Sequence, residues 1–146
     1  MDELAYWAAR RGANRLPCVF EKALLLRCAA CALALPHALA ERETLACTEP
    51  AAHADCQSFH RLLREKSLFA LKIGPAAERI SHAQEVRLQC GGLRGLQEAL
   101  GKPPDVPPDV HLLLRGADIP ELPYSRIIQG VSAWQGRKRT RPGDKA

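Results

Sequence analysis

Cysteine is concentrated in one stretch of this chain, and no other feature limits its possible folds as strongly. Five of the six cysteines lie between Cys18 and Cys56, a stretch of 39 residues that also contains His37 and His53. A chain of 146 residues buries about two-thirds of its unfolded surface, so it needs no disulfides in order to fold. The stretch therefore predicts a metal or iron–sulfur site.

The cellular compartment that the sequence predicts also favours a metal or iron–sulfur site. Residues 1–17 carry acidic side chains early and lack the apolar core of a signal peptide. The most apolar run, residues 24–35, is interrupted by Arg27 and ended by Pro36, so it is shorter than the about 20 residues of a membrane span. We expect a cytoplasmic protein without membrane contact. Its thiols are then reduced, which favours metal binding or free cysteine over disulfides.

The spacing of the cysteines suits an iron–sulfur cluster better than a structural zinc site. A structural zinc site usually has two close pairs of ligands, and this chain contains one Cys-x-x-Cys pair. An iron–sulfur cluster takes mainly thiolates, and several helices and loops can supply them at irregular spacing. The predicted ligands are Cys18, Cys28, Cys31, Cys47 and Cys56.

Three alternatives stay open at this point. Cys28, Cys31, Cys56 and His60 form a looser zinc pattern, with the last two spaced to share one helix face. Cys90 precedes two glycines, which let backbone amides approach a cluster, so it is an alternative ligand. The cysteines on apolar helix faces are also explained by packing, because a free cysteine behaves as a small hydrophobic residue.

The composition predicts a mainly α fold, a single small domain of five or six short helices. Alanine and leucine dominate, whereas valine, isoleucine and threonine are scarce. Within one expected helix Cys28 and Cys31 share a face and point inward. The expected helices cover residues 2–11, 20–35, 48–66, 76–100 with a break after Cys90, and 123–135, while residues 37–43 form a turn or a helical turn and 44–47 are extended.

Positive charge is concentrated at the end of the chain. Of the net charge of +5, the last ten residues carry five basic side chains against one acidic one, or +4. We expect a helical, cysteine-rich domain over residues 1–136 and a disordered basic tail over 137–146. Such a tail solubilises the chain or binds an acidic partner surface or a nucleic acid.

Motifs of known enzymes are missing from the sequence. It contains no phosphate-binding glycine motif, no His-Glu-x-x-His and no Gly-x-Ser-x-Gly. A non-enzymatic role is therefore favoured, and no catalytic residue is predicted. The function expected is that of a small iron–sulfur protein in electron transfer, in redox sensing or as an accessory to a larger redox enzyme or regulator. The alternative is a zinc-stapled or metal-free adaptor that binds a protein or nucleic-acid partner.

Overall fold

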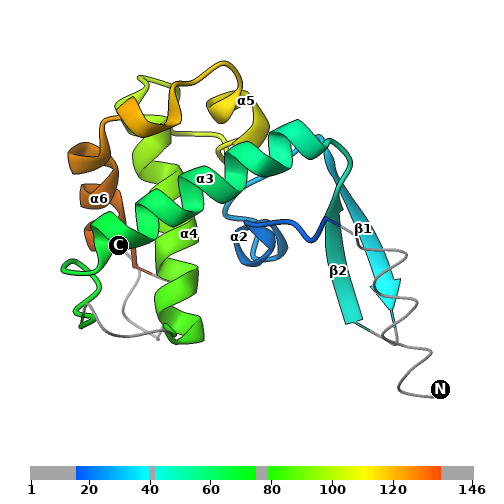
Figure 1. Ribbon diagram of the computed structural model, residues 1–146, viewed down its shortest axis with the longest axis horizontal. Coiled ribbons are helices and arrows are strands. Elements are labelled where there is room, and N and C mark those ends of the chain that lie inside the picture. Colours follow the sequence, from blue (N-terminus) through cyan, green and yellow to red (C-terminus); the bar gives the residue numbers. More distant parts are fainter. Residues whose placement is uncertain (1–15, 40–41, 75–78, 136–146) are drawn as a thin grey trace, which may run out of the picture.

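The computed structural model describes residues 16–39, 42–74 and 79–135, and this part is mainly helical with a small two-stranded sheet (Figure 1). The predicted fold class is confirmed. The predicted helix 2–11 and the tail 137–146 lie outside the described residues. The elements are α2 (Glu21–Leu25), β1 (Ala34–Leu39), β2 (Arg42–Cys47), α3 (Pro50–Ser67), α4 (His82–Ala99), α5 (Val110–Leu114), the 3-10 helix η1 (Ile119–Glu121) and α6 (Tyr124–Ala133).

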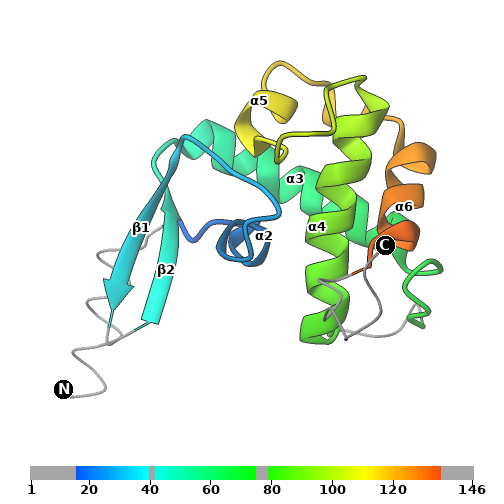
Figure 2. The same ribbon diagram turned by 180° about the vertical axis from the view of Figure 1, so that it is seen from behind.

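The core lies where α3, α4 and α6 meet, with α2 closing one side (Figures 1 and 2). The β-hairpin lies at the edge of the molecule, beside the start of α3 (Figure 1). No described helix has the length and apolarity needed to cross a membrane. The largest fully buried side chains are Phe20, Phe59, Leu63, Leu88, Leu93, Leu96, Val110, Ile127 and Val131.

Helix α3 follows the predicted pattern closely. Pro50 stands in its first turn, where a missing N–H costs nothing. Phe59 and Leu63 lie on its apolar face and are fully buried. The predicted cap, Thr48, is wrong, because the side chain of Glu49 accepts the hydrogen bond from the first turn. The Thr48 hydroxyl instead donates to the Leu33 carbonyl at 2.8 Å.

Helix α4 runs unbroken where a break after Cys90 was predicted. Its glycines do not interrupt it, because they let α6 pack directly on its backbone. A methyl group at Gly91 would lie 2.8 Å from the Gly130 carbonyl oxygen. One at Gly95 would overlap the Ile127 carbonyl. Glycine was expected to weaken the helix, because it is a poor helix former. Here the close packing of α4 on α6 that the glycines allow offsets this loss of helix propensity.

The helix predicted over residues 20–35 is wrong beyond its first turn. It ends at α2 because Arg27 adopts a left-handed backbone conformation with φ of 61°. The Cys28 amide then donates to the Ala23 carbonyl at 2.9 Å, and the Arg27 amide donates to the Leu24 carbonyl at 3.0 Å. These two bonds form the common helix-ending motif that usually has glycine at the left-handed position.

Turns and irregular backbone over residues 26–33, followed by strand β1, replace the rest of that predicted helix, and the hairpin replaces the turn predicted over 37–43. Strands β1 and β2 pair antiparallel, with Ala34 opposite Cys47 and Leu39 opposite Arg42. The extended conformation predicted for residues 44–47 is confirmed. Cys28 and Cys31 therefore do not share a helix face. Pro36 is tolerated because an edge strand needs only part of its backbone groups paired.

The glycine contact between α4 and α6 makes a testable prediction. Gly95→Ala should lower the free energy of unfolding by about 1–3 kcal/mol, because the new methyl group forces the two backbones apart. This loss outweighs the better helix propensity of alanine, about 1 kcal/mol. Gly74→Ala is the matched control, because no atom lies within 4 Å of a methyl group there. Equal urea midpoints for both variants would contradict the packing argument.

Candidate functional site

Backbone pairing brings Cys18 next to Cys47. Residues 16–18 lie antiparallel to the end of β2, with Pro17 opposite Ala46. The Cys18 amide donates to the Leu45 carbonyl at 3.0 Å, and the Cys47 amide donates to the Leu16 carbonyl at 2.7 Å. The two cysteines are thus held on neighbouring extended segments, although 28 residues separate them in the chain.

The turn that contains Cys31 is tied to the same place from two sides. The Thr48 amide donates to the Leu33 carbonyl at 3.0 Å, which joins the turn to the end of β2. Ala30 forms a parallel bridge with Asp109, immediately before α5. Cys31 is therefore fixed between the hairpin and α5.

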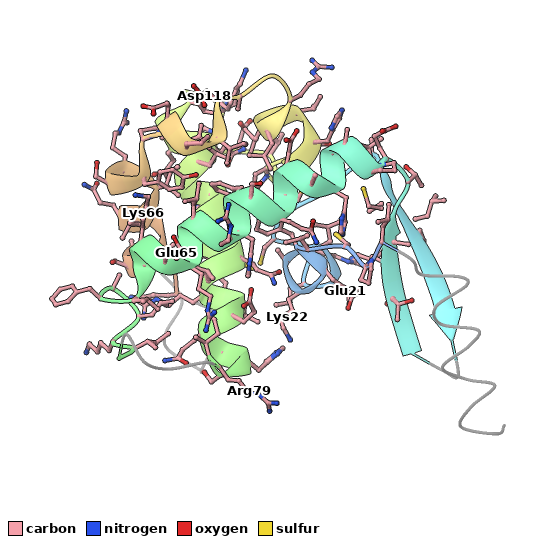
Figure 3. All side chains as sticks on the ribbon, in the orientation of Figure 1. Glu21, Lys22, Glu65, Lys66, Arg79 and Asp118 are labelled. Carbon is pink, nitrogen blue, oxygen red and sulfur yellow. The ribbon has the colours of Figure 1, made fainter. Side chains whose placement is uncertain are left out.

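Helix α3 contributes Cys56. The ring Nε2 of His53, a buried residue on α3, lies 2.9 Å from the Pro17 carbonyl oxygen. This hydrogen bond anchors the first turns of α3 to the segment that carries Cys18, and Cys56 follows three residues after His53. Helix α2 is joined to β2 by a further hydrogen bond, in which the Glu21 carboxylate accepts from the Leu45 amide at 2.9 Å (Figure 3).

The four thiols held in this way interact with one another. Burial, together with smaller contributions from the charges of Cys31 and Cys47, raises the pKa of Cys18 to about 11. Burial raises the pKa of Cys56 to about 12, with added contributions from the other three thiols. Burial likewise raises the pKa of Cys31, which also responds to Cys47. Every pair among the four is therefore close enough for electrostatic interaction.

Backbone amides point at two of these sulfurs. The Phe20 amide hydrogen-bonds the Cys18 sulfur, and the amides of Leu33 and His111 hydrogen-bond the Cys31 sulfur. Each bond opposes the effect of burial and lowers the thiol pKa. In Cys18 and Cys31 one donor is the residue two positions further along the chain. Hydrogen bonds of this kind stabilise thiolates and tune metal centres bound by them.

Three of these thiols, those of Cys31, Cys47 and Cys56, line a cavity of about 210 Å³. Its walls combine sulfur with acidic groups, which favour a cation. The Asp55 carboxylate adds to the raised pKa of Cys56, and the Cys47 thiol donates to the Glu49 carbonyl at 3.3 Å. The side chains that line it include Cys31, Cys47, Cys56, Glu49, Asp55, His111 and Arg115.

The remaining candidate ligands lie elsewhere. Cys28 shares a different cavity with Cys90, so it stands apart from the other four predicted ligands. The His60 ring lies 2.8 Å from the Glu85 carboxylate, and Glu85 also accepts from Gln89 at 2.7 Å. The looser zinc pattern, which needs both Cys28 and His60 beside Cys56, is therefore not assembled here.

Sequence reasoning missed the contribution of α5. The amide of His111 and the approach of Asp109 to Ala30 come from residues about 80 positions after Cys31, and no local pattern marks them.

Over residues 16–39, 42–74 and 79–135, no three His, Cys, Asp or Glu side chains are arranged to hold a metal ion.

Comparison with known proteins adds no assignment, since no family model, curated protein or solved structure matches this chain.

The raised thiol pKa values predict how the metal-free protein responds to alkaline pH. Because folding raises the pKa of Cys18 and Cys56 above the ordinary 9.0 to about 11 and about 12, the folded chain keeps protons that the unfolded chain loses. Stability from these thiols is fully present below pH 9 and falls as the pH rises through those values. Melts of the reduced, chelator-treated protein across this window should show the fall.

Cys56→Ala should make that decline shallower, whereas Ser58→Ala, on the same helix and without a titrating group, should leave its slope unchanged. A slope unaffected by Cys56→Ala would show that this thiol does not carry the effect.

Proposed function

We propose that the chain binds an iron–sulfur cluster through Cys18, Cys31, Cys47 and Cys56, in an electron-transfer, redox-sensing or accessory-subunit role. The observation that carries this proposal is the mutual interaction of four thiols from four separate segments. Packing alone explains one buried cysteine at a time, but it gives no reason for four to meet. Cys28 and Cys90 are left out because they occupy another cavity.

The donor set favours a cluster over a single zinc ion. Four thiolates around one zinc ion, each about 2.3 Å from it, stand only about 4 Å apart. A cluster spaces its thiolates more widely, and the adjoining cavity of about 210 Å³ supplies room for an inorganic core.

The electrostatics of the site also favour a bound cation. Glu21 adds to the raised pKa of Cys18, Asp109 to that of Cys31 and Asp55 to that of Cys56. Partial burial and, to a smaller extent, these carboxylates favour the protonated form of the Cys18, Cys31 and Cys56 thiols in the metal-free chain. A cation offsets this penalty, while the amides on Cys18 and Cys31 stabilise the thiolates. A bound cluster supplies one-electron exchange, and this chain orients and partly shields it.

We assign the protein to the reducing cytoplasm, because four thiols available for a cluster must stay reduced. Its partner is a larger redox enzyme or regulator. The four thiols are partly exposed, and those of Cys31, Cys47 and Cys56 line an open cavity, so a docked protein can approach within electron-transfer distance. The basic tail is a second contact, to a protein or a nucleic acid.

Iron and sulfide analysis after anaerobic expression tests the proposal. The wild-type chain should be brown and contain iron and acid-labile sulfide. Cys18→Ser, Cys31→Ser, Cys47→Ser and Cys56→Ser should each lose most of both, because each removes a thiolate ligand. Cys28→Ser and Cys90→Ser are matched controls from the other cavity and should retain both.

Two results would overturn this assignment. A colourless protein with one zinc ion, lost in the same four variants, would establish the zinc-stapled adaptor instead. Metal content equal to wild type in Cys18→Ser and Cys56→Ser would remove these residues from the ligand set.

Metal affinity should depend steeply on pH. At neutral pH the thiols of Cys18 and Cys56 carry protons that a metal must displace, because their pKa values are about 11 and about 12. Affinity should therefore rise as the pH increases toward those values, by up to about tenfold per pH unit for each proton released. Competition with a chelator of known pH dependence measures this rise, and a flat profile would mean that the thiols do not ionise on binding.

A further inference from the structure

The two cysteines outside the proposed cluster lie together at the wall of a second cavity. Cys90 lies in the middle of α4 and is 1% exposed, whereas Cys28 is partly exposed. Their side chains form a hydrogen bond, although 61 residues separate them in the chain. Both line a cavity of about 250 Å³.

The backbone fixes this pair from both sides. The left-handed turn at Arg27 directs the chain so that the Cys28 amide bonds back to Ala23 at 2.9 Å. Cys90 is held by the close packing of α4 on α6 through Gly91. The two sulfurs therefore meet between a rigid turn and a rigid helix. They need only move from hydrogen-bond distance to about 2.05 Å to form a disulfide.

Charged side chains line the cavity together with both cysteines. Two of them are cationic, Arg27 and Arg94, and one is acidic, Asp105, so positive charge is in excess there. Reactive cysteines are typically found in partly exposed surroundings of this kind. The cavity also contacts the solvent through exposed residues, including Arg27, Asp105 and Val106, so a small oxidant has a route to Cys28.

We propose that Cys28 and Cys90 form a peroxide-reactive dithiol that closes to a disulfide, separate from the four-thiol site. The Cys28 thiolate attacks a hydroperoxide, which breaks the O–O bond and leaves Cys28 as a sulfenic acid with release of water or an alcohol. The Cys90 thiol then displaces hydroxide from this sulfur, and the two form the disulfide and a second water. Two thiols are oxidised, and one peroxide is reduced by two electrons.

The surroundings of Cys28 and Cys90 determine which of the two thiols reacts first with the peroxide. Burial raises the pKa of Cys90, and the hydrogen bond and charge of Cys28 raise it further. Cys90 therefore keeps its proton and acts second, while the more exposed Cys28 reacts first. A small-molecule thiol reverses the reaction by two exchange steps, which regenerate both thiols and oxidise two of its own molecules to a disulfide.

Peptide mapping of the full-length protein tests this proposal. The anaerobically purified chain is treated with one equivalent of hydrogen peroxide, alkylated and digested without reductant. The expected product is a peptide pair linked through Cys28 and Cys90, lost after treatment with dithiothreitol. The full chain with Ser58→Ala, a position that lines neither cavity, is the matched control and should give the same linked pair.

The two single variants separate the roles. Cys90→Ser should accumulate a sulfenic acid at Cys28 that dimedone traps, whereas Cys28→Ser should react at neither position. Far-ultraviolet circular dichroism establishes that both variants are folded. The proposal is overturned if peroxide links other cysteines while Cys28 and Cys90 stay reduced, or if folded Cys28→Ser is oxidised at Cys90 as fast as wild type. Neither result depends on whether the other four thiols bind a cluster.

Discussion

Two backbone hydrogen bonds between residues 16–18 and the end of β2 decide where the thiols of this protein lie. They place Cys18 beside Cys47, and the hydrogen bond from His53 to Pro17 then fixes α3 to the same segment. The turn at Cys31 is held to the end of β2 by Thr48. Since the hairpin and α3 have few other points of attachment to each other, the arrangement of the four sulfurs depends on this short pairing.

The packing of the helices depends on a different constraint, the absence of side chains along one stripe of α4. Gly91 and Gly95 let α6 approach until backbone touches backbone. Arg87 on α4 then donates to the carbonyl of Val131 at 2.8 Å and to that of Ser132, which satisfies the end of α6. The core is thus closely packed on the side that carries Cys90. Figure 1 shows α6 beside the end of α3, whereas the hairpin lies beside its start.

The parts of the fold that follow from the sequence are those with strong periodicity and end signals. Helices α3 and α6 were predicted because their apolar residues recur at helical spacing. The conformation of residues 26–39 was predicted wrongly, because a high density of alanine and leucine is typical of a helix. What redirects it is nonlocal, namely the pairing of β1 with β2 and the bridge from Ala30 to Asp109. A glycine at position 27 would have marked the end of the helix in the sequence, whereas an arginine in the left-handed conformation gives no such signal.

The sequence indicates which cysteines are candidates, but not how the fold divides them. Density and spacing named Cys18, Cys31, Cys47 and Cys56, and their thiols lie close enough to interact in the structure, while their role as ligands stays a prediction. Cys28 was grouped with Cys31 because helical periodicity put them on one face. Because the helix ends at α2, the two intervening residues carry Cys31 toward α5 and leave Cys28 beside Cys90 of α4.

This division has a chemical consequence, because it separates two thiol groups that would otherwise interfere. A bound cluster would need thiolates that are shielded from oxidants. At the four-thiol site burial, with smaller contributions from nearby carboxylates, raises the pKa of Cys18 and Cys56 and so makes the free thiols less reactive. The cavity beside Cys28 and Cys90 is lined by two arginines and one aspartate instead. This difference in surroundings supports the proposed metal site at one place and the proposed peroxide chemistry at the other. Oxidation at Cys28 would then consume no ligand of the proposed cluster.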